Sequence, residues 1–164
     1  MEIGLSDILK LVVSIVACFA AAGIGSLFTF KAIPTWYATL KKPPYTPPNW
    51  AFGPVWAALY TLMAVSVFIV WRKGLAAEGV LPAFVLFWIQ LAVNVIWSII
   101  FFGMKSKGGG VITIIALWLL IAATMAASFQ VSAWAGGLLV PYLVWVTIAS
   151  YLNIGVWRLN KTNK

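Results

Sequence analysis

The sequence predicts an all-α membrane protein, a bundle of five transmembrane helices with an ordered, proline-rich first loop. Hydrophobic residues make up 63% of the 164 residues and charged residues only 9%, whereas soluble domains carry roughly 25% charged residues. Five apolar segments of a length that can cross the roughly 30 Å hydrocarbon core are separated by short breaks. We therefore treat residues 1–164 as a single membrane domain.

The five apolar segments set the expected order of the chain. Their spans are predicted at about residues 8–30, 51–71, 81–104, 111–129 and 137–158. Asp7 precedes the first span and is a candidate helix cap, because an acid suits the positive end of a helix dipole. The run Lys105–Gly110 is expected to be a flexible turn, and residues 130–136 a short uncharged one.

Residues 31–50 form the expected loop between the first two spans. Proline fixes φ near −65°, removes a backbone donor and holds the preceding residue extended. Five of the 21 residues from Trp36 to Trp56 are prolines: Pro43, Pro44, Pro47, Pro48 and Pro54. Because proline lowers the entropy lost on ordering, we predict an ordered lid over one end of the bundle.

The net charge of +8 is distributed unequally between the two sides of the predicted bundle. One side carries Lys10, Arg72 and Lys73, and the other carries Lys31, Lys41, Lys42, Lys105, Lys107, Arg158, Lys161 and Lys164. By the positive-inside rule, loop 31–50 and the C-terminus face the cytoplasm and the N-terminus faces outward. Cations at the ends of apolar segments are typical of membrane anchoring, so nucleic acid is not an expected partner.

Conventional catalytic groups are scarce. The chain has no histidine, its acids are Glu2, Asp7 and Glu78, and Cys18 is its one cysteine. No ionisable side chain of the kind that proton-coupled pumps require lies inside a span. No metal site, acid–base pair or activated nucleophile is expected. Whether the protein is an enzyme stays open, since any chemistry must come from a ligand, from light or from aromatic side chains.

Two helical faces carry the candidate binding residues. Gln90, Asn94 and Ser98 are spaced by four on the third span, with Trp97 beside them. Polar groups in hydrocarbon need partners, so this face is either helix–helix contact or the polar wall of a ligand cavity. On the fifth span, the residues spaced by four are Trp145, Ala149 and Asn153.

Three sequence strings resemble the translocator protein family, also called tryptophan-rich sensory proteins or peripheral-type benzodiazepine receptors. They are WYATLKKPPYTPP from Trp36, QLAVNVIWSIIFF from Gln90 and PYLVWVTIASYLNIGVWRLN from Pro141. One departure is Tyr45, where the common form has tryptophan. The resemblance implies a five-helix bundle, usually a homodimer, with a pocket that the first loop closes.

The resemblance also implies a function. Family members bind porphyrins, notably protoporphyrin IX and haem, and are implicated in stress sensing and in light- and oxygen-dependent porphyrin breakdown. No cofactor is required, because the porphyrin is the ligand. Trp56 and Trp145 coincide with the family's pocket tryptophans. The expected ligand-binding residues are Tyr37, Trp56, Gln90, Asn94, Trp97, Trp145, Ala149 and Asn153.

Two readings of the function remain. If porphyrin is degraded, Trp56 and Trp145 are the candidate catalytic residues, acting as an electron relay, because indole is the most easily oxidised ring available. The alternative is a transporter or binding protein for a sterol-like or other apolar ligand, without catalysis. Ile154 occupies the tyrosine position of the family's sterol pattern, which argues against a specific sterol role.

Overall fold

A computed structural model of the protein describes residues 4–161 and contains five long helices with two short π-helical segments. The elements are α1 (Leu5–Ala32), η1 (Ile33–Tyr37), α2 (Asn49–Arg72), α3 (Val80–Ser98), η2 (Ile99–Gly103), α4 (Lys107–Val131) and α5 (Ala133–Leu159). All five helices are long and apolar enough to cross a membrane, so the predicted all-α, five-helix fold is confirmed. Glu2 and Lys164, which entered the sequence-based account of charge, lie outside the described residues.

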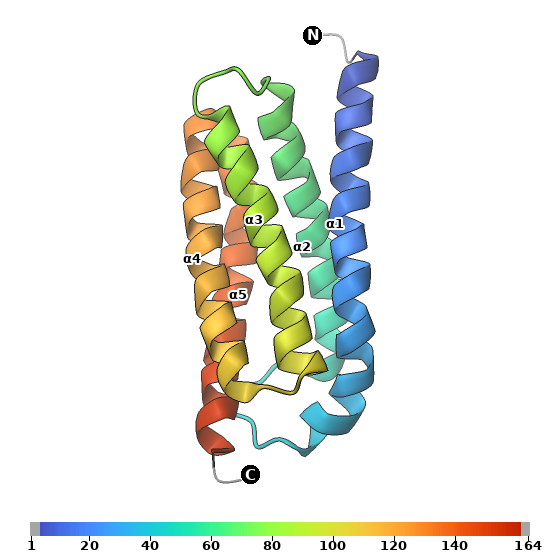
Figure 1. Ribbon diagram of the computed structural model, residues 1–164, viewed down its shortest axis with the longest axis vertical. Helices are drawn as coiled ribbons and strands as arrows, with labels where there is room; N and C mark the ends of the chain where they lie inside the picture. The colour runs from blue at the N-terminus through green and yellow to red at the C-terminus, as the bar shows by residue number, and fades with distance from the viewer. Residues whose placement is uncertain (1–3, 162–164) are drawn as a thin grey trace.

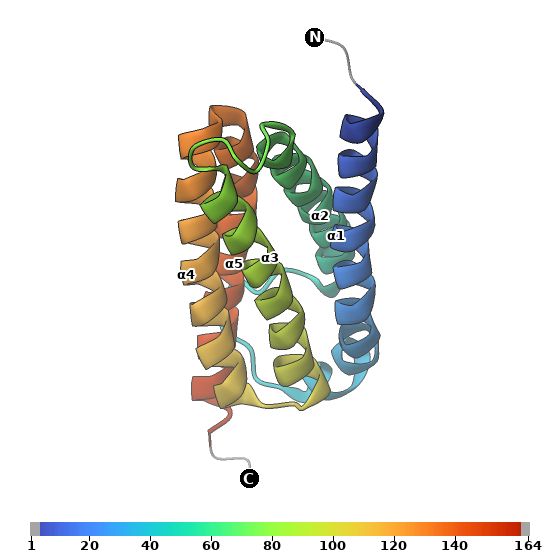
Figure 2. The same ribbon diagram turned by 45° about the horizontal axis from the view of Figure 1, so that its top comes forward.

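The helices run up and down in a bundle, and the two termini lie at opposite ends (Figure 1). Around the bundle the neighbouring helices are α1, α2, α5, α4 and α3, with α3 closing the ring against α1. Figure 2 shows α3 between α4 and α1, with α2 and α5 behind it. The five helices therefore enclose a buried interior, in which one large and one small cluster of apolar side chains are packed.

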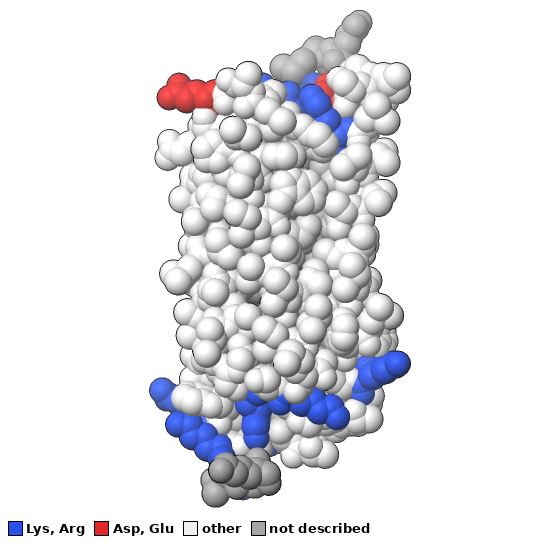
Figure 3. Space-filling model, in the orientation of Figure 1, with Lys and Arg blue, Asp and Glu red and all other residues white. Residues whose placement is uncertain are grey.

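We name the two ends by what they contain. The loop end holds residues 33–50, 99–110 and 153–161, and the ion-pair end holds residues 4–10, 66–83 and 128–139. Lys and Arg side chains gather at both ends and leave the surface between them uncharged (Figure 3). This wide apolar surface is the part of the bundle that lipid covers.

The first connection is shorter than the predicted loop 31–50. Helix α1 continues through Ala32 into η1, and helical geometry persists to Thr39, so the non-helical segment is residues 40–48. Pro34 lies inside η1. Because proline has no N–H to donate, it removes one bond of the ladder, and here the helix widens rather than ends.

The two expected turns next to α4 are also shorter than predicted. Gly108, Gly109 and Gly110 form the first turn of α4, where the Ser106 hydroxyl accepts a hydrogen bond from the Gly109 N–H at 3.2 Å. A Cβ at Gly110 would lie 2.9 Å from Asn153 Oδ1, so glycine there permits close packing rather than flexibility. At the other end of α4, Ser132 alone separates α4 from α5.

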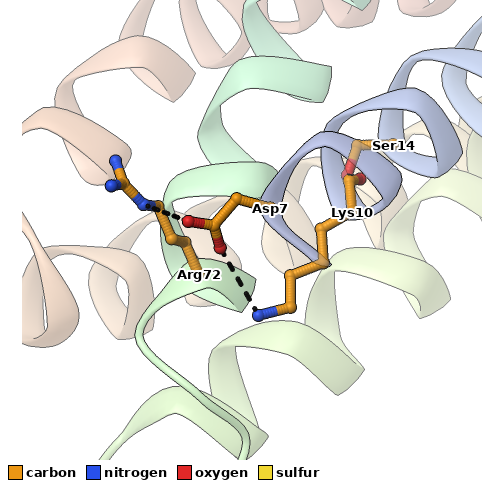
Figure 4. Close-up of polar contacts among 4 residues, drawn as sticks. All are labelled: Asp7, Lys10, Ser14 and Arg72. Atoms are coloured by element: carbon orange, nitrogen blue, oxygen red, sulfur yellow. Dashed lines mark hydrogen bonds and ion pairs between the residues drawn. The ribbon is translucent and has the colours of Figure 1, made fainter. Parts of the chain in front are cut away.

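Asp7 does not cap α1, contrary to the sequence-based expectation. The N-cap is Gly4, which has no side chain that could accept a hydrogen bond from the first turn. The Asp7 carboxylate instead contacts Arg72 Nε of α2 at 3.2 Å and Lys10 Nζ at 3.7 Å (Figure 4). Two cations within reach compete successfully with the backbone N–H groups, and the acid ties α1 to α2.

Candidate ligand site at the loop end

Two π-helical segments meet at the loop end and bring four aromatic rings together. η2 contains the five-residue bond that defines this geometry, from the Met104 N–H to the Ile99 carbonyl at 2.8 Å. Edge-on ring pairs link η1 to η2, with centroid distances of 5.4 Å for Trp36–Phe101 and 5.9 Å for Tyr37–Phe102. Single π turns inside α-helices are frequent at functional sites, which makes this junction the first place to seek one.

A small cavity lies beside this junction. It is lined by Tyr37, Phe52, Trp97, Phe101, Phe102, Ala149, Leu152 and Asn153. Its volume is about 20 Å³, which is room for about one water molecule. Pockets for small-molecule ligands measure roughly 300–1,000 Å³, so a ligand of that size requires the loop or the lining rings to move.

The structure brings four of the eight predicted binding residues to this cavity: Tyr37, Trp97, Ala149 and Asn153. The Trp97 indole N–H donates to Asn153 Oδ1 at 3.3 Å, and Asn153 Nδ2 donates to the Ala149 carbonyl at 3.0 Å. The Trp97 ring is also nearly parallel to that of Phe101, at 8° and 6.1 Å. The polar side-chain atoms of Trp97 and Asn153 are therefore partnered, and apart from Tyr37 the other lining residues are apolar.

Trp56 and Trp145 lie behind the cavity rather than in its lining. The Trp56 ring lies 6.3 Å from the Trp97 ring and 6.2 Å from that of Tyr142. The Trp145 ring packs edge-on against Phe52 at 5.7 Å. Each tryptophan is thus one ring removed from the cavity. Within the described chain the indole N–H of Trp145 is buried without a hydrogen-bond partner.

Gln90 and Asn94 form a buried polar chain with Tyr142, away from the lining. Asn94 Nδ2 donates to the Tyr142 hydroxyl at 2.8 Å, and that hydroxyl donates to Gln90 Oε1 at 3.0 Å. These bonds join α3 to α5. The Gln90 Nε2 group has no partner among residues 4–161. Direct contact of these two side chains with a ligand remains a prediction.

Sequence reasoning missed four lining residues, Phe52, Phe101, Phe102 and Leu152. The signal was present, since two of them end the string QLAVNVIWSIIFF and Leu152 precedes Asn153 in the string from Pro141. Polar and indole side chains received more weight there than phenylalanine and leucine, although apolar side chains make up most of a ligand pocket.

The loop lies against α5 and η1 beside the cavity. The Tyr151 hydroxyl donates to the Pro44 carbonyl at 3.0 Å, and the Lys42 ammonium lies 4.7 Å from the centre of the Tyr37 ring. Pro43 packs so closely on Gly155 that a Cβ there would lie 2.6 Å from Pro43 Cγ.

Within residues 4–161, no group of three or more His, Cys, Asp and Glu side chains that could hold a metal ion is present.

Fold and site together define a multi-pass integral membrane protein with an aromatic cavity at one end of a five-helix bundle. Comparison with known proteins identifies its family. The chain belongs to the TspO/MBR family, which matches residues 14–158. The resemblance read from the three sequence strings is thereby confirmed.

Relatives in different domains of life cover most of the chain. It is 42% identical over 154 residues to the tryptophan-rich protein TspO of Archaeoglobus fulgidus, covering 94% of this chain and 99% of the relative. It is 44% identical over 151 residues to protein CrtK of Rhodobacter capsulatus, covering 91% of each. With the human translocator protein the identity is 40% over 139 residues, covering 84% of this chain and 82% of the relative.

Proposed function

We propose that the protein binds a tetrapyrrole, protoporphyrin IX or haem, in an enlarged form of the aromatic cavity at the loop end. The observation that carries the proposal is the convergence of Tyr37, Trp97, Ala149 and Asn153, which come from three separate segments, on one cavity. The names of two relatives, a tryptophan-rich sensory protein and a translocator protein, are consistent with a protein that senses or moves a ligand.

A porphyrin suits the chemistry of this wall. It is a flat, largely apolar disc with two carboxylates, and offset stacking on an aromatic ring contributes about 0.5–1.5 kcal/mol beyond the area buried. The parallel rings of Trp97 and Phe101 already stack in this way. Lys41 and Lys42, on the loop, are the cations placed to meet the carboxylates.

The orientation in the membrane follows from charge. The described residues at or next to the loop end include seven cations, Lys31, Lys41, Lys42, Lys105, Lys107, Arg158 and Lys161, whereas the opposite end carries three, Lys10, Arg72 and Lys73. By the positive-inside rule the loop end faces the cytoplasm, so ligand would exchange on that side. A homodimer, as the family resemblance implies, is part of the same proposal.

Binding is tested by filling the cavity. Ala149→Trp should lower the affinity for protoporphyrin IX at least tenfold, as measured by the Soret shift and by quenching of tryptophan fluorescence. Trp134→Ala is a suitable control, because Trp134 is 80% exposed at the ion-pair end. Unchanged affinity in Ala149→Trp would place the porphyrin elsewhere and contradict the proposal.

Light- and oxygen-dependent degradation is the finer part of the proposal, with Trp56 and Trp145 as the electron relay. Trp56 connects to the cavity through Trp97, and Trp145 connects through Phe52. Phenylalanine keeps a flat face but is far harder to oxidise. Trp56→Phe and Trp145→Phe should therefore bind protoporphyrin IX with an affinity within a few-fold of the parent's. Under illumination, the Soret band of the bound porphyrin should decay far more slowly in these variants.

The outcomes separate the two functions. A defined product that depends on the two tryptophans supports degradation, whereas full turnover in the double phenylalanine variant leaves them as packing residues. Binding without any new product supports a carrier or sensor. If protoporphyrin IX does not bind and a sterol or another apolar ligand does, the alternative without catalysis replaces the proposal.

A further inference from the structure

Asn160 joins three parts of the loop end. It follows the last residue of α5 and is only 4% exposed. Its Oδ1 accepts a hydrogen bond from the Lys41 N–H at 3.1 Å, and its Nδ2 donates to the Lys41 carbonyl at 2.8 Å. One carboxamide thus pairs both main-chain groups of a loop residue, as a neighbouring β-strand would.

The carboxamide is held in position from both sides. Asn160 Nδ2 also donates to the Val156 carbonyl at 2.8 Å, and the Asn160 N–H donates to the same carbonyl at 3.1 Å. The Asn160 carbonyl in turn accepts from Lys107 Nζ of α4 at 2.7 Å. Because α4 and α5 fix the residue, little side-chain entropy is lost when it binds the loop.

The loop offers few other places for a main-chain bond. Four of the nine residues in 40–48 are prolines, which have no N–H to donate. The second polar contact with α5 is the bond from the Tyr151 hydroxyl to the Pro44 carbonyl. Between these two bonds Pro43 fills the notch above Gly155. Among residues 4–161, the Asn160–Lys41 pair at the end of α5 is therefore the one place where two hydrogen bonds hold the loop.

We propose that Asn160 is the latch of the loop, a positioning residue whose bonds to Lys41 set how often the loop lifts from the cavity. Leu152 and Asn153, which line the cavity, lie on α5 between Tyr151 and Gly155, the two residues that contact the loop. No residue of the loop itself lines the cavity, so the loop acts from beside it, and lifting the loop from α5 would free the helix segment that carries these two lining residues. The ligand that passes is the one proposed above, and the latch itself can be tested without any ligand.

Hydrogen exchange of the loop amides, measured by mass spectrometry in nanodiscs, tests the latch. Asn160→Ala should raise the exchange of the Lys41 amide, whose N–H donates to Asn160, by roughly ten- to thirtyfold, as expected for the loss of two ordinary hydrogen bonds. Amides in the middle of α3 and α4 should exchange as in the parent. Unchanged loop exchange, or an equal increase in every helix, would overturn the proposal.

Two further variants separate the latch from general stability. Asn160→Asp keeps the acceptor for the Lys41 N–H and loses the donor, so its loop exchange should lie between those of the parent and Asn160→Ala. It also serves if Asn160→Ala does not fold. Lys107→Met removes the contact from α4 and leaves the carboxamide in place, so its loop exchange should rise much less than that of Asn160→Ala. An effect of Lys107→Met as large as that of Asn160→Ala would overturn the role of the carboxamide.

The ligand then shows whether the latch is a gate. Association of protoporphyrin IX, followed by stopped-flow fluorescence, should accelerate in Asn160→Ala by about the factor seen in loop exchange. Faster exchange with unchanged association overturns the gate. If the parent binds no porphyrin while loop exchange responds as expected, the proposed function fails and the latch stands.

Discussion

The two ends of the bundle are held together by different means. At the ion-pair end, Asp7 joins α1 to α2, and the Ser66 hydroxyl donates to the Ala135 carbonyl at 2.8 Å to join α2 to α5. At the loop end, aromatic rings, close glycine contacts and the carboxamides of Asn153 and Asn160 make the connections, and no acid is present. Figure 3 shows the resulting difference in charge between the ends.

The segments that connect the helices also differ between the two ends. At the ion-pair end, one residue joins α4 to α5 and seven join α2 to α3, so the helices fix one another's position. At the loop end, nine non-helical residues precede α2, and Lys41, Pro43 and Pro44 among them contact α5 or its C-cap. These residues can leave α5 without unfolding a helix. The comparison therefore indicates the more rigid packing at the ion-pair end, and it supports the proposal that ligand exchanges at the loop end.

The largest expected effect comes from crowding the loop end. In Gly110→Leu, a new Cβ 2.9 Å from Asn153 Oδ1 should displace the cavity wall, at a cost of about 3 kcal/mol. Gly137→Leu, in α5 at the ion-pair end, is the control, because nothing lies within 4 Å of a Cβ there. Thermal unfolding followed by tryptophan fluorescence in detergent should show a large decrease for Gly110→Leu alone. Equal decreases would mean that the two ends do not differ in packing.

Helix number and order could be predicted from the sequence because membrane insertion depends on local composition. A run of about 20 apolar residues predicts a span whatever its neighbours are. The cavity residues Trp97 and Asn153 could be predicted from spacing within a single helix, together with the family strings. These are properties of one segment at a time.

What the sequence could not show depends on contacts between distant segments. The latch joins residues 41 and 160, which are 119 positions apart. The glycines before Val111 read as a flexible turn, although Gly110 is required by the approach of Phe101 and Asn153. Likewise, the sequence predicts that the first span ends at about residue 30, whereas the chain stays helical through Thr39 and Tyr37 packs against Phe101 and Phe102.

The polar chain in the middle of the bundle provides the next largest effect. Tyr142→Phe leaves Asn94 Nδ2 and Gln90 Oε1 without the Tyr142 hydroxyl, which should cost about 1–2 kcal/mol. Because the chain joins α3 to α5 between the ends, thermal stability should fall while loop exchange stays unchanged. Faster loop exchange in this variant would show that the two ends are coupled through the interior.

Loosening the loop tests whether its stiffness matters. Replacing Pro47 and Pro48 with glycine increases the conformational freedom of the unlatched loop and should cost about 1 kcal/mol of closure. The expected results are faster cleavage of the loop by protease and several-fold weaker porphyrin binding, with little change in thermal unfolding. Unchanged cleavage and affinity together would contradict the lid.

The smallest effect is expected at the ion-pair end. Asp7 is 15% exposed and contacts two cations that are themselves partly exposed, so solvent and salt screen the pairs (Figure 4). Asp7→Asn should therefore lower stability by only about 0.5 kcal/mol at low ionic strength.

The dependence of thermal stability on salt concentration distinguishes the parent from Asp7→Asn. In the parent, raising the salt concentration weakens the attraction of Asp7 for Arg72 and Lys10 and should lower the melting temperature slightly. In Asp7→Asn that part of the salt dependence should be absent, and the two proteins should converge at high salt. Loop exchange should not respond to Asp7→Asn at any salt concentration, because the Asn160–Lys41 bonds involve no charged atom. A loop that opens when Asp7 is neutralised would show that α1 transmits the state of one end to the other, since η1 continues α1 directly into the loop.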